Sequence, residues 1–207
     1  MYIKIDGLNK PDEIKKAMEN GTNMFGLFFS KNNDECIKQI SSNAGIIPDY
    51  AGGTALTTNK SMSVGGSSSI SLVGIFENDM PQDIITRIYN YNLNYVQLNG
   101  EESSVMIENL RNTVIPDIAP EIGIIKRLVI NSKDDIAAWT EYKNTVDLLI
   151  FEIDALKNGD YKEAANIISS YSGNIPFILE CGDTNESIEM AKGIGHSLFT
   201  GINITNK

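Results

Sequence analysis

The sequence predicts an α/β fold with a parallel sheet. Short apolar runs alternate with helix-like stretches along the chain, and these runs are rich in Ile, Leu, Val and Phe on both of their faces. Continuous apolar strands are typical of a sheet that is covered on both sides. Strict alternation of strand and helix favours neighbouring strands that run in the same direction. Several runs also end in Gly and polar residues, as expected where parallel strands meet a ligand.

Eight segments have the composition of buried strands. Eight parallel strands can close into a barrel, or they can remain an open doubly wound sheet, and the apolar pattern alone leaves both architectures open. The predicted strands are Tyr2–Asp6, Met24–Phe29, Ser71–Phe76, Asn94–Leu98, Ile122–Val129, Asp147–Glu152, Ile175–Glu180 and Leu198–Ile204.

Six segments between these strands are predicted to be helices. The first opens with a proline and acidic residues and stops at Asn20-Gly21, which are typical start and stop signals. In the second, Ile84, Ile85 and Ile88 share one face, and Ser103 or Ser104 is available to cap the third. The predicted helices are Pro11–Glu19, Pro81–Tyr91, Glu102–Asn112, Ser132–Tyr142, Tyr161–Ser172 and Thr184–Lys192.

The stretch between Asn43 and Ile70 departs from this alternation because it is loaded with Gly, Ser, Thr and Asn. A Gly/Ser segment that precedes a helix can cradle phosphate, but this one precedes a strand. The composition therefore predicts a flexible surface loop.

Length and composition set the class of protein. We expect residues 1–207 to form a single domain, since 207 residues suffice for one α/β core. No apolar run approaches the roughly 20 residues of a membrane span, and the start of the chain is too short and too charged for a signal peptide. We therefore expect a cytoplasmic protein with no membrane partner.

The charge and the reactive side chains narrow the expected partners. A formal net charge of −10 argues against nucleic acid, which needs a basic face, but not against a small anion held by backbone amides. Cys36 and Cys181 form no motif and are expected to be free thiols. His196 is the single histidine, so no His-based metal site or catalytic triad is predicted.

The most informative motifs lie at two neighbouring strand ends, Val73–Asn78 (VGIFEN) and Tyr95–Ser103 (YVQLNGEES). They resemble the third and fourth strands of the phosphoribosylanthranilate isomerase family, whose usual sequences are close to "VGVFVN" and "VQLHGDES". The same order of matches continues at other strand ends. They are Lys4–Leu8 ("KICGL" in the family), Gly26–Phe29 ("GFVF"), Ile125-Lys126 ("VIKA"), Asp147–Glu152 ("D-x-x-L-F-D"), Pro176–Gly182 ("PFLLSGG") and Gly201–Thr205 ("GVDVSS").

The resemblance implies a TIM-type (β/α)8 barrel with its site at the carboxyl ends of the strands. Because the chain reaches Lys207 directly after the eighth predicted strand, the final helix is expected to be missing. The family performs an Amadori rearrangement in tryptophan biosynthesis, in which a ribosylamine ring opens and a proton leaves C2. The implied substrate is a small phosphorylated sugar, and neither a metal nor an organic cofactor is required.

The chemistry needs a general acid at the ring oxygen and a general base near C2. In the family the base is the cysteine of "KICGL" and the acid is the aspartate that ends the sixth strand. The matching residues here are Asp6 and Glu152. An aspartate is a weaker base than a thiolate, with a reference pKa of about 4 against about 8.5. The related isomerase of histidine biosynthesis uses an aspartate on its first strand, so a carboxylate base is chemically admissible.

Six residues are implied as substrate or phosphate ligands by their match to the family's strand ends or by their place near them. Several neighbouring positions depart from the family. Ser30–Glu35 lacks the arginine that grips the anthranilate carboxylate, Cys181 replaces one of two phosphate-contacting glycines, and Asp154–Asp160 replaces a Gly-rich loop. The six residues are Gln97, Asn99 (histidine in the family), Arg127, Gly182, Asn203 (aspartate in the family) and Thr205.

Arg127 stands near the end of the fifth strand, where the family usually has a small residue. If it points into the mouth of the barrel, it can hold a phosphate or carboxylate that the altered loops no longer hold. If it lies on the surface, it can pair with an acidic neighbour. Sequence alone leaves these two interpretations open.

Two alternatives to the isomerase reaction follow from these departures. The chain can be a diverged paralogue that has lost catalysis and serves as a binding module, in which case a bare barrel flank is expected to contact another chain or to form a homodimer. It can also be an isomerase or aldolase-like enzyme for another phosphosugar, with Arg127 as a phosphate ligand.

Overall fold

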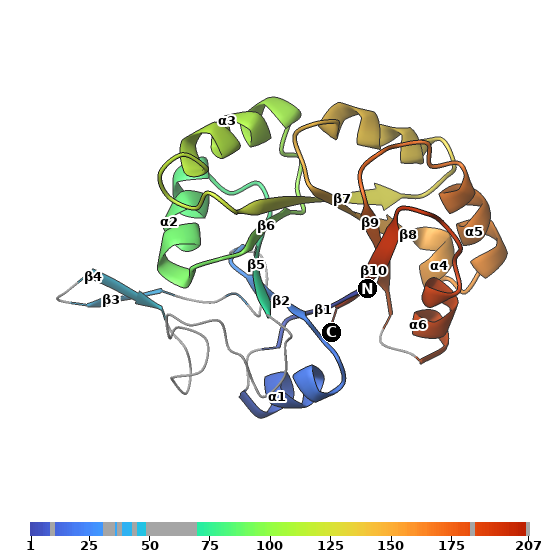
Figure 1. The fold of residues 1–207 in the computed structure, drawn as a ribbon, viewed down its shortest axis with the longest axis horizontal. Helices are drawn as coiled ribbons and strands as arrows, with labels where there is room; N and C mark the ends of the chain where they lie inside the picture. Colours follow the sequence, from blue (N-terminus) through green and yellow to red (C-terminus); the bar gives the residue numbers. More distant parts are fainter. Residues whose placement is uncertain are drawn as a thin grey trace.

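A computed structural model describes residues 1–8, 11–30, 36, 39–42, 45–48, 70–182 and 185–205. Eight parallel strands close into a barrel in the order β1-β10-β9-β8-β7-β6-β5-β2, and helices surround the ring (Figure 1). This confirms the predicted α/β fold and decides for the closed barrel over the open sheet. The strands are β1 (Tyr2–Asp6), β2 (Met24–Phe28), β5 (Ser71–Phe76), β6 (Tyr95–Leu98), β7 (Gly123–Ile130), β8 (Leu148–Ile153), β9 (Phe177–Cys181) and β10 (Phe199–Thr205).

The helices lie between consecutive strands, as the alternation predicts. On α3 the capping residue is Ser103, whose hydroxyl accepts a hydrogen bond from the Met106 amide at 3.3 Å. On α2, Ile84 and Ile88 are buried, as the apolar face predicts. The helices are α1 (Pro11–Glu19), α2 (Pro81–Tyr91), α3 (Ser104–Val114), η1 (Asp135–Tyr142), α4 (Asp154–Lys157), α5 (Tyr161–Ser169) and α6 (Asn185–Lys192).

Three local predictions need correction. The segment predicted as an α-helix from Ser132 is the 3₁₀-helix η1, whose first turn is held by the Asp135 carboxylate on the Ser132 amide at 2.8 Å. The predicted loop after Glu152 begins with the short helix α4. Within the predicted loop from Asn43 onwards, β4 (Gly45–Pro48) pairs antiparallel with β3 (Gln39–Ser42). Its two isoleucines favour a strand, and most of the remaining stretch lies outside the described residues.

The core has an outer and an inner part, because alternate side chains of each strand face opposite sides. Outward residues such as Phe76, Phe151 and Leu179 pack under the helices. Inward residues fill the lower half of the barrel with apolar side chains, each contributing about 1.5–3 kcal/mol by burial. This inner cluster consists of Met24, Val73, Ile125, Leu148, Ile150 and Ile178, with Tyr95 packed against it.

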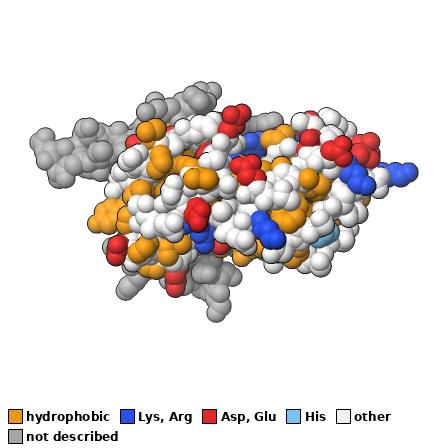
Figure 2. All heavy atoms as spheres, turned by 90° about the horizontal axis from the view of Figure 1, so that it is seen from above, with side chains coloured by type: hydrophobic (Ala, Val, Ile, Leu, Met, Phe, Trp, Pro, Cys, Tyr) orange, Lys and Arg blue, Asp and Glu red, His pale blue; other side chains and the backbone are white. Residues whose placement is uncertain are grey.

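The described surface is mixed in character. On the face shown in Figure 2, acidic, basic and hydrophobic side chains are interspersed. The largest exposed apolar side chains include Met80, Tyr89 and Val105. In the part of the chain that the structure describes, no helix is long and apolar enough to cross a membrane.

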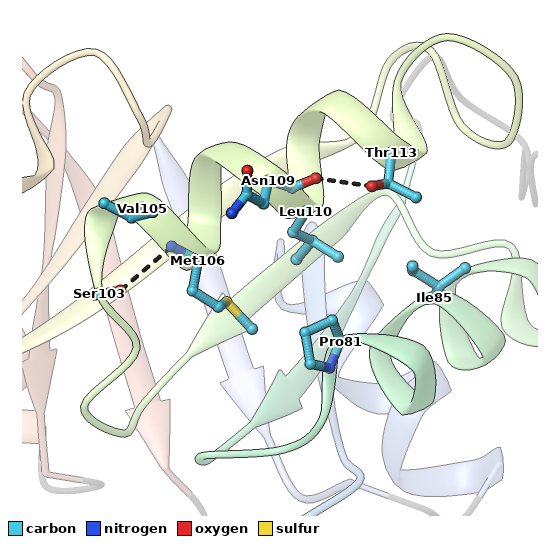
Figure 3. Close-up of a pocket in the computed structure, with 8 residues that line it drawn as sticks. All are labelled: Pro81, Ile85, Ser103, Val105, Met106, Asn109, Leu110 and Thr113. Carbon is cyan, nitrogen blue, oxygen red and sulfur yellow. Dashed lines mark hydrogen bonds between the residues drawn. The ribbon is translucent and has the colours of Figure 1, made fainter.

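An apolar groove runs along the outside of the barrel between α2 and α3 (Figure 3). Met106 and Leu110 of α3 face Pro81 and Ile85 of α2 across it, and its volume is about 320 Å³. None of its lining residues belongs to the predicted site.

Candidate acid–base site in the barrel lumen

Polar side chains replace the apolar ones in the upper half of the lumen. Lys4, Asn203, Glu180 and Glu152 are successive register partners across β1, β10, β9 and β8, so they share the inner face. Asp6 lies two residues beyond Lys4 on the same face. Since parallel strands end together, these groups gather at the carboxyl end of the barrel, which is called the mouth below.

Asp6 is almost fully buried and held on both of its oxygens. Lys4 Nζ forms an ion pair with Oδ1, and the Asn203 side-chain amide donates to Oδ2 at 3.0 Å. Lys4 Nζ also donates to Asn203 Oδ1 at 3.0 Å, which closes a triangle of three side chains. The predicted residues Asp6 and Asn203 are thus brought together, and Lys4 fixes them.

The neighbouring strand leaves room for Asp6. A Cβ atom added to Gly26 would overlap the Asp6 carboxylate, so β2 must carry glycine at this position. Gly26 is the register partner of Asp6. The glycine of the Gly26–Phe29 match therefore has a direct physical role in placing the carboxylate.

The electrostatics of the triangle centre on Lys4, whose side chain has no exposed surface. Burial lowers the pKa of Lys4 from its ordinary value, and the attraction of the Asp6 carboxylate offsets part of this effect. The Arg127 charge also lowers the pKa of Lys4, and the Glu180 charge raises it. Lys4 on β1 therefore interacts electrostatically with Arg127 on β7 and with Glu180 on β9.

Glu152 is also buried and contacts two cations. It forms ion pairs with Arg127 of β7 and with Lys157 of α4. The Arg127 Nε group donates to Glu180 Oε2 at 3.1 Å. Arg127 therefore points into the mouth and pairs with acidic neighbours there, which combines the two interpretations that the sequence left open.

The ion pairs of the mouth are balanced among the residues that the structure describes. Three cationic and three anionic side chains take part in them, and each of these carboxylates contacts at least one cation. We call them, together with Asn203, the luminal network. Its members are Lys4, Asp6, Arg127, Glu152, Lys157, Glu180 and Asn203.

Gln97 and Asn99 form a separate pair on the β6 side. The Gln97 side chain is 1% exposed, and its Nε2 donates to Asn99 Oδ1 at 2.9 Å. Gln97 Oε1 is buried and has no hydrogen-bond partner among the described residues. Buried acceptors are nearly always satisfied, so this oxygen is a candidate acceptor for a ligand hydroxyl.

The remaining predicted ligands lie at strand ends. Thr205 is the register partner of Asp6 at the end of β10, and Gly182 directly follows β9. Cys181, which replaces a family glycine, packs in the outer core, where burial raises the pKa of its thiol to about 12. Residues 31–35, which belong to the segment that lacks the family's arginine, lie outside the described residues.

The loops on the β5 and β6 side of the mouth are fastened from outside the lumen. Lys126 Nζ donates to the carbonyl oxygens of Leu98 at 3.2 Å and Gly100 at 2.5 Å, and it pairs with Glu102 Oε2 at 3.2 Å. The other Glu102 oxygen accepts from the Asn78 amide at 2.8 Å. This buried clamp therefore joins the segments that follow β5 and β6 to the middle of β7.

Four described residues of the mouth are not predicted as site residues by the sequence. Lys4 could have been found from its i, i+2 spacing to Asp6, which places both on one face of a strand. Glu180 and Val129 are register partners of Glu152 and require the pairing of strands to be known. Lys157 reaches Glu152 from a helix that the sequence did not predict.

Fold and site together define an α/β-barrel protein with buried acidic and basic side chains at the carboxyl end of its strands. The structure shows no group of three or more His, Cys, Asp or Glu residues able to hold a metal ion, as far as its described residues go. A family model, described as N-(5'-phosphoribosyl)anthranilate (PRA) isomerase, matches residues 3–191. The chain belongs to this family.

Individual relatives agree with the family match. The chain is 23% identical to the N-(5'-phosphoribosyl)anthranilate isomerase of Parabacteroides distasonis, covering 100% of this chain and 84% of the relative. It is 21% identical to that of Phocaeicola vulgatus, covering 100% and 87%.

Solved structures of this family share the fold. A phosphoribosyl anthranilate isomerase in complex with reduced 1-(o-carboxyphenylamino)-1-deoxyribulose 5-phosphate superposes with a TM-score of 0.68 at 17% identity, over 100% of this chain and 87% of the other. The isomerase of Thermotoga maritima gives a TM-score of 0.68 at 19% identity, over 99% and 87%.

Proposed function

We propose that the protein is an N-(5'-phosphoribosyl)anthranilate isomerase of tryptophan biosynthesis, with Asp6 as general base and Glu152 as general acid. The observation that carries the proposal is the burial of both carboxylates inside one barrel, at the ends of β1 and β8. They occupy the positions that match the base and the acid of a family to which the chain belongs.

The reaction proceeds by a series of proton transfers. Glu152 donates a proton to the ring oxygen as the bond from this oxygen to C1 breaks and C1 forms a double bond to nitrogen, which leaves an iminium. Asp6 then accepts the proton of C2, which converts the iminium into an enolamine. C1 of the enolamine gains a proton and its C2 hydroxyl loses one, which leaves a carbonyl at C2. The product is an aminoketose, so the reaction moves hydrogen within one molecule and needs no redox partner.

Lys4 and Asn203 prepare Asp6 for this role. By contacting opposite oxygens of the carboxylate, they fix its orientation, which general-base catalysis requires. Lys4 also places a positive charge in contact with the Asp6 carboxylate.

Binding of the substrate draws on both halves of the mouth. Gly182, Asn203 and Thr205, at the ends of β9 and β10, are the proposed phosphate side, by their match to the family's strand ends. Gln97 Oε1 offers an acceptor for a sugar hydroxyl. Val129, 49% exposed on the inner face of β7, offers an apolar surface for an aromatic ring.

The test is turnover of freshly prepared phosphoribosylanthranilate, followed as loss of its anthranilate fluorescence. Asp6→Asn and Glu152→Gln keep the size of each side chain and remove its proton chemistry, so each is expected to lower kcat by about 10²–10⁴-fold. Glu108→Gln, on the exposed face of α3, is the matched control and should leave kcat unchanged. Full activity in either site variant would reject the role assigned to that residue.

The same assay separates the isomerase from the alternatives. No turnover by folded wild-type protein would favour a binding module or another phosphosugar substrate. The second of these alternatives should be tested first, with other aminopentose phosphates as substrates of the wild-type protein, because the luminal network carries both acidic and basic groups.

We also propose a cytoplasmic homodimer with no nucleic-acid partner. Support for the dimer comes from the Thermotoga maritima isomerase, whose structure is described as that of monomers generated from a dimeric protein. The absence of a disulfide between the two cysteines suits a reducing compartment, and a net charge of −10 disfavours nucleic acid. Sedimentation equilibrium at micromolar concentration tests the dimer, and a mass of 22.7 kDa would contradict it.

A further inference from the structure

We propose that Arg127 is an exchangeable carboxylate receptor. In the unliganded protein Glu152 and Glu180 hold its guanidinium, and the ring carboxylate of the substrate takes it over on binding, while one proton enters the Glu152–Glu180 pair from solvent. This inference rests on the proposed function, and it assigns how the site recognises its substrate and how it acquires a protonated carboxyl group.

The geometry gives an incoming carboxylate access to Arg127. Its Nε donates to Glu180 Oε2 at 3.1 Å, and its Nη2 pairs with Glu152 Oε2. The Arg127 side chain is 23% exposed, against 14% for Glu180 and 7% for Glu152. The cation is therefore the most accessible member of the three, and the planar guanidinium fork matches a carboxylate well.

Within the described part of the chain, the charges around Arg127 leave no spare cation for a further anion. Lys157 of α4 faces the other Glu152 oxygen, and Lys4 of β1 is already paired with Asp6 and bonded to Asn203. Three cations thus balance three carboxylates before any ligand arrives.

A substrate carboxylate adds a fourth anion to this enclosed site. Burying an uncompensated carboxylate costs several kcal/mol, whereas protonating one carboxylate restores the balance. The proton belongs to Glu152 and Glu180 as a coupled pair, since both lose part of the same guanidinium. Lys157 is 39% exposed, so solvent screens its hold on Glu152 more than that of Arg127.

The exchange has a chemical consequence. A general acid must carry a proton when substrate is bound, but an ion pair favours the ionised carboxylate. Substrate binding itself would supply the protonated group, and only when the ligand carries the carboxylate that displaces Arg127. Recognition of the anthranilate carboxylate and protonation of the general acid would then occur in the same binding step.

The experiment is calorimetric titration of wild-type protein with reduced 1-(o-carboxyphenylamino)-1-deoxyribulose 5-phosphate, in buffers of different ionisation enthalpy at about pH 8, where the phosphate is already dianionic. We expect uptake of about one proton, and a Kd that rises about tenfold per pH unit over the range in which one proton is taken up. The analogue without the ring carboxylate is expected to bind with no proton uptake.

Two variants separate the parts of the proposal. Glu180→Gln removes one anion, so it should bind the carboxylated ligand without proton uptake. Arg127→Met should lose the preference for the carboxylated ligand by about tenfold or more, with little change toward the analogue. Glu189→Gln, on the exposed face of α6, should behave as wild type in every titration.

The outcomes distinguish this inference from the proposed function. Binding of the carboxylated ligand by wild type without proton uptake, undiminished uptake in Glu180→Gln, or an unchanged ligand preference in Arg127→Met would each overturn the exchange and leave the isomerase standing. Failure of folded wild-type protein to bind either ligand would overturn both.

Discussion

The position of the Asp6 carboxylate depends on the absence of a Cβ atom at Gly26 on the neighbouring strand. The carboxylate occupies the space in which a side chain at Gly26 would begin, so the position of the proposed base is set by two strands. A single methyl group on β2 is therefore enough to disturb the base without touching any charge.

We predict that Gly26→Ala lowers kcat by about 100-fold, because displacing a catalytic group by about 1 Å has an effect of that order. The overpacked site should also lose about 1–3 kcal/mol of unfolding free energy. Turnover and urea denaturation measure the two effects. Gly195→Ala is the control, since no atom lies near its added Cβ, and equal activity of both variants would contradict the prediction.

How far the sequence predicts the site is decided at the level of single residues. The location of Asp6, Glu152 and Asn203 at the carboxyl ends of the strands could be predicted, because they match family positions there, and their roles stay predictions. Glu180 and Lys157 could not, because their roles depend on strand register and on the reach of long side chains across the lumen. Arg127 departs from the small residue that the family usually has at its position, but the direction of its side chain depends on packing, which no sequence motif encodes.

At the scale of elements, the strands were predictable because a buried parallel strand is a continuous apolar run. Their observed ends differ from the predicted ones by at most two residues. Short elements such as α4 and β4 were missed, because four residues are too few to show a period. The type of η1 was also missed, since 3₁₀ and α-helices share their capping signals.

The clamp formed by Lys126 and Glu102 connects several elements, and its stability can be tested. Lys126→Met is expected to cost about 3–5 kcal/mol, because it leaves a buried carboxylate without its cation. Lys126→Met combined with Glu102→Gln should recover part of this loss. Urea denaturation of both variants gives the values, and a double variant no more stable than the single one would contradict the pairing.

Tyr142 links η1 to the same clamp, since its hydroxyl donates to the Glu102 carbonyl at 3.3 Å. Burial raises the pKa of Tyr142 to about 12 from an ordinary 10. The phenol therefore stays protonated to a higher pH in the folded protein than in the unfolded chain. The corresponding stabilisation of the folded state is present below about pH 10 and is lost as the pH rises toward 12.

We therefore predict that unfolding free energy falls more steeply between pH 10 and 12 in wild type than in Tyr142→Phe. The difference should be on the order of 1–3 kcal/mol across that window. Denaturation at a series of pH values measures it, and parallel curves for the two proteins would show that Tyr142 titrates alike in both states. Tyr89→Phe, at an exposed tyrosine, is the control.

At the scale of the whole molecule, the chain has a net charge of −10, while the ion pairs of the mouth balance one another among the described residues. The proposed anionic substrate would therefore be repelled at long range before it reached the mouth. We predict that kcat/KM rises about twofold as salt increases from low to physiological ionic strength, because screening acts first on distant charges.

Steady-state kinetics at several sodium chloride concentrations test this prediction. The double variant Glu108→Gln and Glu121→Gln reduces the net charge at two exposed positions, so its salt dependence should be weaker than that of wild type. A fall of kcat/KM with salt in wild type would mean that local attraction in the mouth outweighs the repulsion.

The space beside Gly26, which the Asp6 carboxylate fills, also determines which side chains β1 can carry at this position. A family that usually places a thiol on the first strand has here a carboxylate, and the glycine of β2 provides the volume that this larger group occupies. A thiol needs less room than this carboxylate, so Asp6→Cys is a substitution that the barrel should accommodate without any second change.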